Sequence, residues 1–182
     1  YSFSKGKADI TVTKKGGFIC SILSDAYAYE QTISPKEAIK RGEDFLEKLG
    51  YEDMEAVRVR ENGAEIDFTF VYTDDGVAYY PDTVKLKVCL SRGVVTAMDA
   101  SEYLRCHKDR EDPVVRLNMS EAKAKLHRAL TVETAKLAVV KTARGERPAY
   151  EFLCSYEGER YFVYLDAGNG NEIAIVNVRT VG

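Results

Sequence analysis

Two histidines, His107 and His127, are the side chains of this sequence best suited to proton transfer near neutral pH. Neither accompanies a G-x-S-x-G or Ser-x-x-Lys nucleophile motif, so the sequence offers no candidate for a hydrolytic triad. Cys106 beside His107 supplies two possible metal ligands, but a structural site needs about four and no second pair lies at zinc-finger spacing. We therefore predict no metal site and no cofactor, and we interpret the residues around His107 as a polar linker.

Acidic side chains could cleave a glycosidic bond, which requires two carboxylates roughly 5 to 10 Å apart. The candidates are Asp74–Asp75 and the acidic residues within 109–112. Asp74–Asp75 is followed by a glycine, which is typical of a hairpin turn. The segment Asp166–Glu172 carries oxygen ligands but lacks the residue order of a calcium loop, because its third position is Gly168. We predict turns at Asp74–Asp75 and Asp166–Glu172, a linker at 109–112, no catalytic residue, and a chain that is not an enzyme.

The cysteines are widely separated and form no C-x-x-C motif: Cys20, Cys89, Cys106 and Cys154. All but Cys106 lie in apolar strand-like stretches, where a cysteine behaves as a small buried hydrophobe. Two disulfides would be conceivable in an oxidising compartment.

The composition indicates a globular chain of mixed charge. Of 182 residues, 45% are hydrophobic and 30% are charged, which is enough for a buried core in one domain or two. The net charge of -3 is spread over both signs, so we do not expect the basic surface that nucleic acid requires. No stretch approaches the run of about 18 apolar residues that spans a bilayer. Because the sequence starts at Tyr1, we expect any signal or membrane anchor to lie upstream.

Internal repetition organises the chain. Hairpins made of two alternating strands around a glycine turn are expected at 8–23, 84–98 and 160–178. Their turn glycines are separated by 76 and 77 residues, which is a domain-sized period: Gly17, Gly93 and Gly170.

A helix is predicted before the second hairpin and another before the third. Ser34 with Pro35 and Glu37 gives an N-cap, a proline at the first helical position and a capping-box carboxylate. Asn118 with Glu121 repeats the box. Each helix carries an apolar stripe, and further strand candidates separate it from its hairpin: 56–60, 66–72, 135–140 and 149–154. We therefore predict an α+β fold of tandem repeats, each with one helix packed on a four-stranded antiparallel sheet.

The predicted domain organisation has four parts. Residues 1–29 hold the C-terminal hairpin of a truncated preceding repeat, and residues 30–104 form a complete repeat. Residues 105–115 form the linker, and residues 116–182 form the last repeat. We expect the two complete repeats to have separate sheets.

The first hairpin lacks a helix of its own. We expect its apolar face, which carries Ile10, Val12, Phe18 and Ile22, to pack on the next repeat or on another chain. A homodimer is therefore one of the expected assemblies.

An aromatic segment distinguishes the two complete repeats. Their helix starts, at 34 and 118, are separated by 84 residues instead of 77, because an insertion around Tyr79, Tyr80 and Pro81 is absent from the last repeat. Tyrosine offers a large contact area with a polar tip. These three residues are our candidate partner-binding site, because we expect an exposed tyrosine pair beside a proline to be a rigid contact. The alternative is that the insertion covers the adjoining repeat.

Several segments resemble known domains. Ser34–Ala38, which reads Ser-Pro-Lys-Glu-Ala, and the hairpin Tyr161–Gly170 with its Asp-Ala-x-x-Gly turn resemble PepSY domains. More narrowly, a set of segments in this order resembles the YpeB family of spore germination proteins: Lys14–Gly17, Ile33–Ala38, Phe45–Tyr51, Gly76–Asp82 and Val84–Val88. The similarity runs over nearly the whole chain, which identifies the repeats as tandem PepSY domains from the C-terminal part of such a protein.

This resemblance implies a non-catalytic spore germination protein that binds and stabilises or regulates the cortex-lytic enzyme, a lytic transglycosylase that digests cortex peptidoglycan. It also implies a location between the inner spore membrane and the cortex, with a membrane-anchored region upstream of this chain. General PepSY similarity implies an alternative, a peptidase-inhibitor or propeptide-like regulatory module. A cortex-degrading enzyme is a third hypothesis, which release of muropeptides from cortex would support.

Overall fold

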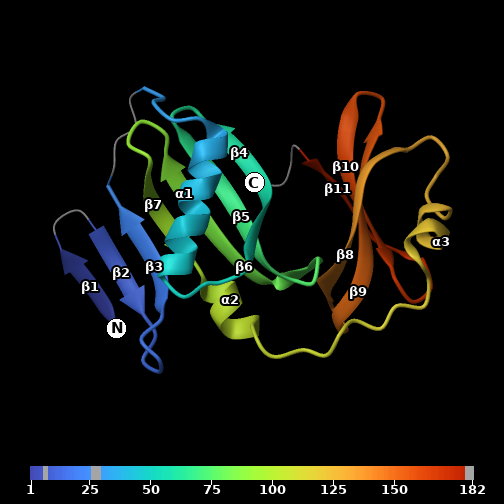
Figure 1. Ribbon diagram of the computed structural model, residues 1–182, viewed down its shortest axis with the longest axis horizontal. Helices are drawn as coiled ribbons and strands as arrows, with labels where there is room; N and C mark the ends of the chain where they lie inside the picture. The colour runs from blue at the N-terminus through green and yellow to red at the C-terminus, as the bar shows by residue number, and fades with distance from the viewer. Residues whose placement is uncertain (6–7, 26–29, 179–182) are drawn as a thin grey trace. The chain divides into compact units, whose positions relative to one another are not determined.

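The computed structural model describes residues 1–5, 8–25 and 30–178, which form two compact units (Figure 1). Unit 1 comprises residues 1–72 and 82–107, and unit 2 comprises residues 73–81 and the described residues from 108 onwards. None of the described helices combines the length and the apolar character that a bilayer crossing requires.

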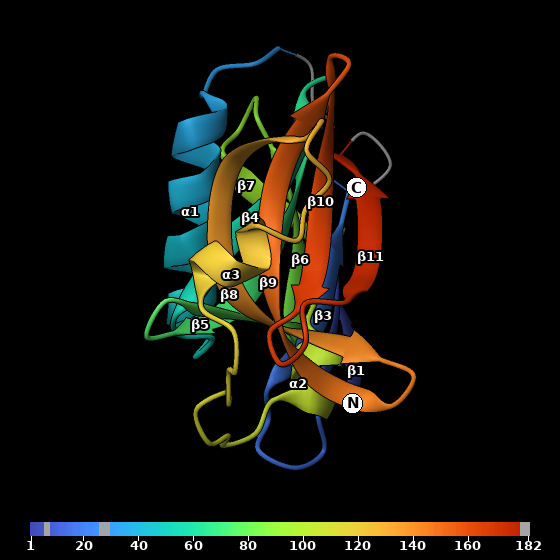
Figure 2. The same cartoon turned by 90° about the vertical axis from the view of Figure 1, so that its right-hand side faces the viewer.

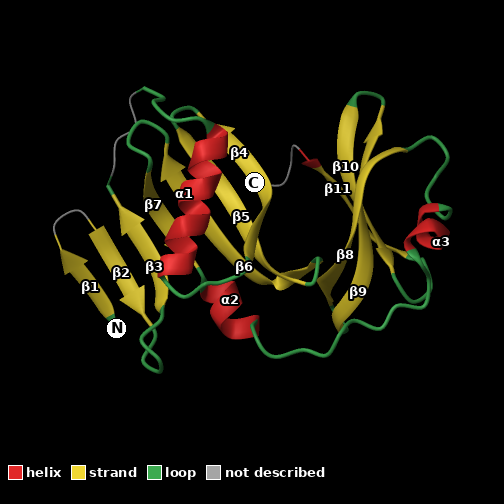
Figure 3. Ribbon diagram, in the orientation of Figure 1, coloured by secondary structure: helices red, strands yellow, loops and turns green. Residues whose placement is uncertain are grey.

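Unit 1 is a mixed helix and sheet structure whose strands follow the order β1-β2-β3-β7-β6-β5-β4. Its elements are β1 (Ser2–Lys5), β2 (Ala8–Val12), β3 (Ile19–Ser24), α1 (Pro35–Lys48), β4 (Met54–Asn62), β5 (Glu65–Asp74), β6 (Val77–Cys89), β7 (Val94–Asp99) and α2 (Ser101–Cys106). Helix α1 lies across one face of this sheet (Figure 3). The predicted helix and the four strands that follow it are thus confirmed for the first complete repeat.

Helix α1 begins where the sequence predicts. The Ser34 side chain accepts a hydrogen bond from the Glu37 backbone N–H at 3.2 Å, and proline occupies the first turn. Its buried face includes Gly42, where an added Cβ would lie 3.0 Å from the ring of Phe70. The missing side chain therefore lets the helix approach the sheet closely. The core below it contains Ala38, Leu46, Tyr51, Ile66, Phe68, Phe70, Val84, Leu86, Val88, Leu90, Met98 and Ala100.

Unit 2 is built on an antiparallel meander, β8-β9-β10-β11 (Figure 2). Its elements are α3 (Met119–Lys123), β8 (Thr131–Thr142), β9 (Gly145–Tyr156), β10 (Glu159–Asp166) and β11 (Glu172–Asn177). The capping box predicted at Asn118 and Glu121 is present, but α3 has only five residues, and turns replace the longer helix that we expected. Ala122 on α3 still packs against Phe152 and its neighbours in the core of the sheet.

One backbone contact recurs in both units. In unit 1 the N–H groups of Thr32 and Ile33 donate to the Leu90 carbonyl at 3.0 and 3.1 Å. In unit 2 the N–H groups of Arg116 and Leu117 both donate to the Ala167 carbonyl at 3.0 Å. We call each of these arrangements the carbonyl clamp. It joins the chain just before the helix to the turn of the last hairpin, so the repeat seen in the sequence is also a repeat of contacts.

The pairing of strand β6 contradicts the prediction that the two complete repeats have separate sheets. Val77–Pro81 belongs to unit 2, where Ala78 and Tyr79 pair in parallel with β8. Lys85–Cys89 pairs antiparallel with β7 in unit 1. The strand order therefore continues through β6, and the sheet is not wholly antiparallel, because this strand of 13 residues is long enough to pair with different neighbours along its length. The compact units accordingly differ from the predicted boundaries at 104 and 116.

The N-terminal hairpin packs on the next repeat, as one of our two expectations stated. Strand β3 pairs with β7, and Ile19 and Ile22 contact the core of unit 1. Ile10 and Val12 are half-buried, but Phe18 remains 48% exposed, so this part of the expected burial is wrong. An additional strand, β1, extends the hairpin at its outer edge.

The turn of the last hairpin generates a stability prediction. Gly170 has φ +73°, and an added Cβ would lie 2.1 Å from Lys125 Cδ and 3.0 Å from Leu117 Cδ1. Gly158 has a similar φ of +80° but no atom within 4 Å of such a Cβ. Both Gly→Ala changes should lower the free energy of unfolding, and Gly170→Ala should lower it by roughly 1 kcal/mol more, because the neighbours must also shift. Urea unfolding of the two variants measures the difference, and equal losses would contradict the close approach.

Candidate functional site

The aromatic segment predicted to bind a partner forms part of unit 2. Tyr79 is only 4% exposed, Pro81 is buried and Tyr80 is half-buried. The expectation that these residues are exposed is therefore wrong for Tyr79 and Pro81. The physical reason is that the start of β6 pairs with β8, whose backbone groups would otherwise form an open sheet edge. Whether this segment contacts a partner stays a prediction.

Tyr80 forms a buried polar contact inside unit 2. Its hydroxyl donates a hydrogen bond to Oε2 of Glu151, which is buried in β9. Its ring meets that of Tyr164 edge to face, with 5.8 Å between the ring centroids. Burial, followed by the negative charge of Glu151, raises the pKa of the Tyr80 hydroxyl well above its usual value. Tyr80 therefore stays a proton donor that satisfies a buried carboxylate.

Arg110 anchors the predicted linker to unit 2. Its Nε and one terminal nitrogen each lie 3.0 Å from a different carboxylate oxygen of Glu146. Its guanidinium also lies over the ring of Tyr79, 5.2 Å from the centroid. Hydrogen bonding to Arg110 lowers the pKa of the Glu146 carboxyl, and Lys108 adds a second positive charge 3.7 Å away. Arg110, which belongs to the linker predicted at 105–115, is thus packed against unit 2.

His107 is paired with a residue that the sequence gave no reason to select. Its Nδ1 lies 2.7 Å from Oδ2 of Asp82, a fully buried residue of β6. The imidazole stacks on Tyr103 with 4.3 Å between the ring centroids and meets Tyr72 edge to face at 4.9 Å. This cluster holds the end of α2 on the sheet of unit 1. The one feature of the sequence that could have pointed to this pair is Asp82, an acidic residue inside an apolar strand.

The other candidates for chemistry have local structural roles. Cys106 Sγ lies 3.6 Å from a carboxylate oxygen of Glu102, so neighbouring Cys106 and His107 contact different partners. Within the described ranges, no three His, Cys, Asp or Glu side chains are arranged to hold a metal ion. Asp75 has a φ of +43°, which confirms the turn predicted there.

Two of the cysteines in strands are fully buried. Cys89 and Cys154 are buried, as predicted, whereas Cys20 and Cys106 are half-buried. Burial raises the pKa of the Cys154 thiol, which keeps it protonated and lowers its reactivity.

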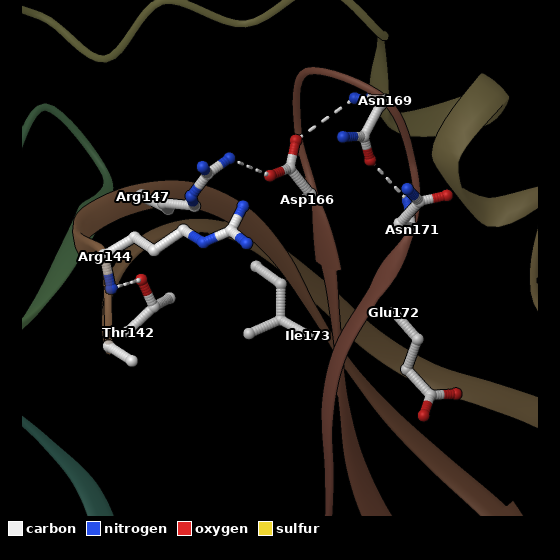
Figure 4. Close-up of a pocket in the computed structure, with 9 residues that line it drawn as sticks. Thr142, Arg144, Arg147, Asp166, Asn169, Asn171, Glu172 and Ile173 are labelled. Atoms are coloured by element: carbon white, nitrogen blue, oxygen red, sulfur yellow. Dashed lines mark hydrogen bonds and ion pairs between the residues drawn. The ribbon is translucent and has the colours of Figure 1, made fainter.

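A shallow pocket of about 330 Å³ lies in unit 2 where the β8–β9 and β10–β11 turns meet (Figure 4). Arg144 and Arg147 come from the first turn, and Asp166, Asn169 and Asn171 come from the second. We call it the two-arginine pocket. The second turn lies where the sequence predicts it, but nothing in the sequence places the two arginines beside it, because the two turns are adjacent only after the meander has formed.

Asp166 organises this pocket without being available for chemistry. Its Oδ1 accepts hydrogen bonds from the backbone N–H groups of Gly168 at 2.8 Å and Asn169 at 3.1 Å. Its Oδ2 accepts from Arg147 at 3.1 Å. Both oxygens of the carboxylate are therefore engaged in shaping the turn and orienting Arg147, which confirms the turn predicted for this segment.

Comparison with known proteins assigns the two parts of the chain to related families. Residues 2–113 match the family described as YpeB sporulation, PepSY1 and PepSY2 domains. Residues 116–176 match the family described as peptidase propeptide and YPEB domain. The first match covers more than half of the chain, and the second covers most of the last repeat.

Curated relatives and a solved structure agree with these matches. A sporulation protein YpeB from Halalkalibacterium halodurans is 33% identical over 164 residues, which cover 90% of this chain and 37% of that protein. The YpeB of Bacillus subtilis is 30% identical over 168 residues, covering 88% of this chain and 36% of its own length. The Bacillus megaterium YpeB C-terminal domain has 29% identity and a TM-score of 0.85, covering 93% of this chain and 76% of its own. The chain thus spans little more than a third of these two curated relatives.

Arg110 and Arg160 form a matched pair for measuring the anchor. Each guanidinium makes two hydrogen bonds to one glutamate, but the Arg110 side chain is 9% exposed and that of Arg160 is 52% exposed. Arg110→Gln should lower the free energy of unfolding by about 2 kcal/mol, because two charge-assisted hydrogen bonds from a largely buried guanidinium are lost. Arg160→Gln should cost less than about 1 kcal/mol, because water screens the exposed pair. Chemical denaturation compares them, and equal costs would show that Arg110 is not an anchor.

The Arg110–Glu146 pair also predicts a pH dependence. Because the pKa of Glu146 is lowered in the folded state, its stabilising contribution is present above the unfolded-state pKa and is lost as the pH falls through the acid range. Melting temperatures of the wild type should therefore fall more steeply on acidification than those of Arg110→Gln. Parallel curves for the two proteins would rule out this contribution.

Proposed function

Because this chain belongs to the YpeB family of sporulation proteins, we propose that it is a non-catalytic module that binds the spore cortex-lytic transglycosylase and stabilises or regulates it. The family assignment itself gives the chain a sporulation-related role. The partner, the absence of catalysis and the location between the inner spore membrane and the cortex are the parts that we propose.

The observation that carries the proposal is the family match, which extends over both repeats. The contacts of the polar groups are in keeping with it. Three of the buried or half-buried carboxylates have structural partners: Asp82 with His107, Glu146 with Arg110, and Asp166 with its own turn. A protein without chemistry of its own can act by binding one state of another protein, which stabilises that state by mass action.

The N-terminal hairpin offers the contact surface that we favour for the partner. Phe3 pairs with Ile10, Ile10 with Ile22 and Ile22 with Met98, so these side chains lie on the face that carries the core of unit 1. Met98 is buried, whereas Phe3 is 59% exposed. The apolar face therefore continues beyond the part that α1 covers. Of the three aromatic-segment residues proposed earlier, only half-buried Tyr80 retains exposed area for a contact.

A matched pair of substitutions tests both the partner and the face. Leu23 is 62% exposed and pairs with Ala97 and Asp9, which places it on the opposite face of the same hairpin. In titration calorimetry against the lytic transglycosylase, Phe3→Ser should weaken binding by roughly 1 to 2 kcal/mol and Leu23→Ser should not. Melting curves verify the fold, and gel filtration reveals whether a second copy occupies the face instead. If the wild-type chain does not bind the enzyme, the proposed partnership fails for this part of the protein.

A second candidate function rests on the match of residues 116–176 to the peptidase propeptide and YPEB domain family. If the last repeat acts as an inhibitor-like module, the chain should slow a spore peptidase in a direct activity assay. A protein that instead released muropeptides from purified cortex would contradict the non-catalytic assignment.

A further inference from the structure

The two-arginine pocket contains a cation, Arg144, that has no counterion among the residues that the structure describes. Arg144 lies at the tip of the β8–β9 hairpin, where its backbone N–H donates to the Thr142 hydroxyl and that hydroxyl donates to the Gly145 carbonyl at 2.8 Å. The turn is thereby fixed through its backbone. The Arg144 guanidinium itself makes no hydrogen bond or ion pair with any residue that the structure describes.

Arg147 is held in place beside it. Asp166 accepts a hydrogen bond from one terminal nitrogen of Arg147 at 3.1 Å, and the turn N–H groups hold the Asp166 carboxylate in turn. A guanidinium has five N–H donors, so this single contact leaves Arg147 able to bind a second acceptor. Its side chain is 43% exposed, so a ligand can reach it.

The charges that line the pocket leave one positive charge uncompensated. Asp166 neutralises Arg147, and the carboxylate of Glu172 points away from both guanidiniums in Figure 4. Arg144 is therefore the cation available to an incoming group. Each guanidinium is a planar set of N–H donors, and such a set matches the two oxygens of a carboxylate.

The remaining lining suits a peptide. Asn169 and Asn171 also line the pocket. The Asn169 side-chain oxygen accepts from the Asn171 backbone N–H at 2.7 Å, so its NH2 group and the Asn171 side-chain amide are the groups that can pair with a peptide group. Ile173 supplies an apolar wall between Arg144 and Glu172. The volume of about 330 Å³ is at the small end of ligand sites, which is suited to the last residue or two of a chain.

We propose that the two-arginine pocket binds the free terminal carboxylate of a short peptide, with the carboxylate on Arg144 and Arg147 and the preceding peptide group beside Asn169 and Asn171. This binding goes beyond the proposed partnership with the lytic enzyme and does not depend on it. The same chemistry occurs at the end of a protein chain, built of L-residues, and at the end of a cell-wall stem peptide, which carries D-alanine.

An amide NMR titration of the whole chain tests the proposal. The probes are N-acetyl-L-alanyl-L-alanine, N-acetyl-D-alanyl-D-alanine, the corresponding C-terminal amides, and inorganic phosphate. We expect at least one free-acid dipeptide to shift the amide signals of Gly145, Gly168 and Asn169 with a roughly millimolar dissociation constant, as suits so small a ligand. The tighter of the two enantiomers identifies the source of the peptide.

Two variants make the test specific to the pocket. Arg144→Gln should raise the dissociation constant about tenfold or more, because it removes a charge-assisted hydrogen-bonding group whose guanidinium contacts no polar partner among the described residues. Arg128→Gln removes the same charge from an exposed position of unit 2 outside the pocket and should change the constant less than about twofold. The far-ultraviolet circular dichroism of both variants should match that of the wild type.

Four results would overturn the proposal. Equal binding of the C-terminal amides would show that the carboxylate is not recognised. Tighter binding of inorganic phosphate at the same signals would show a general anion site. An unchanged constant in Arg144→Gln, or no shift at these three residues with any dipeptide, would show that the pocket does not bind a peptide end.

Discussion

The carbonyl clamp is the contact on which each unit depends. Where the chain approaches the helix, two consecutive N–H groups share one carbonyl at the turn of the last hairpin, Leu90 in unit 1 and Ala167 in unit 2. The first and last parts of a repeat are thereby joined, which fixes where the helix crosses the sheet. This contact explains why unit 2 keeps the same arrangement although α3 has only five residues. A helix so short has little stability of its own and relies on its cap and on tertiary contacts.

The clamp also explains why the turn residues are constrained. A cationic side chain from the helical region lies over the turn glycine in both units, Arg41 over Gly93 and Lys125 over Gly170. Both glycines have positive φ, and a Cβ at either one would meet that side chain. In unit 1, Arg41 additionally donates to the Gly93 carbonyl at 3.1 Å. Backbone conformation and side-chain packing therefore require glycine at the same place in each repeat.

Most of the side chains that could carry chemistry are used to build the fold. Along β6, Tyr80 satisfies Glu151 in unit 2 and Asp82 satisfies His107 in unit 1. A buried carboxylate without a partner would destabilise the fold, and these pairs avoid that cost. Side chains that are used in this way are in keeping with the proposal that the protein acts by binding. The two-arginine pocket is different, because Arg144 remains available there. Both binding surfaces that we propose, at the hairpin tips and on the N-terminal hairpin, lie outside the packed cores.

Local rules in the sequence were sufficient for the repeats, the helix starts and the turns. Ser34 and Asn118 act as N-caps, and Gly17, Gly93 and Gly170 all have positive φ in the turns where the sequence placed them, because caps and turns depend on residues only a few positions apart. The tertiary structure alone decided which strand pairs with the start of β6, and hence that Tyr79 is buried. It alone joined Asp82 to His107, 25 residues away, and brought Arg147 to Asp166, 19 residues away. The residues in these contacts lie far apart along the chain, and their spacing follows neither the helical nor the strand period. Only the packed sheet therefore determines which of them meet.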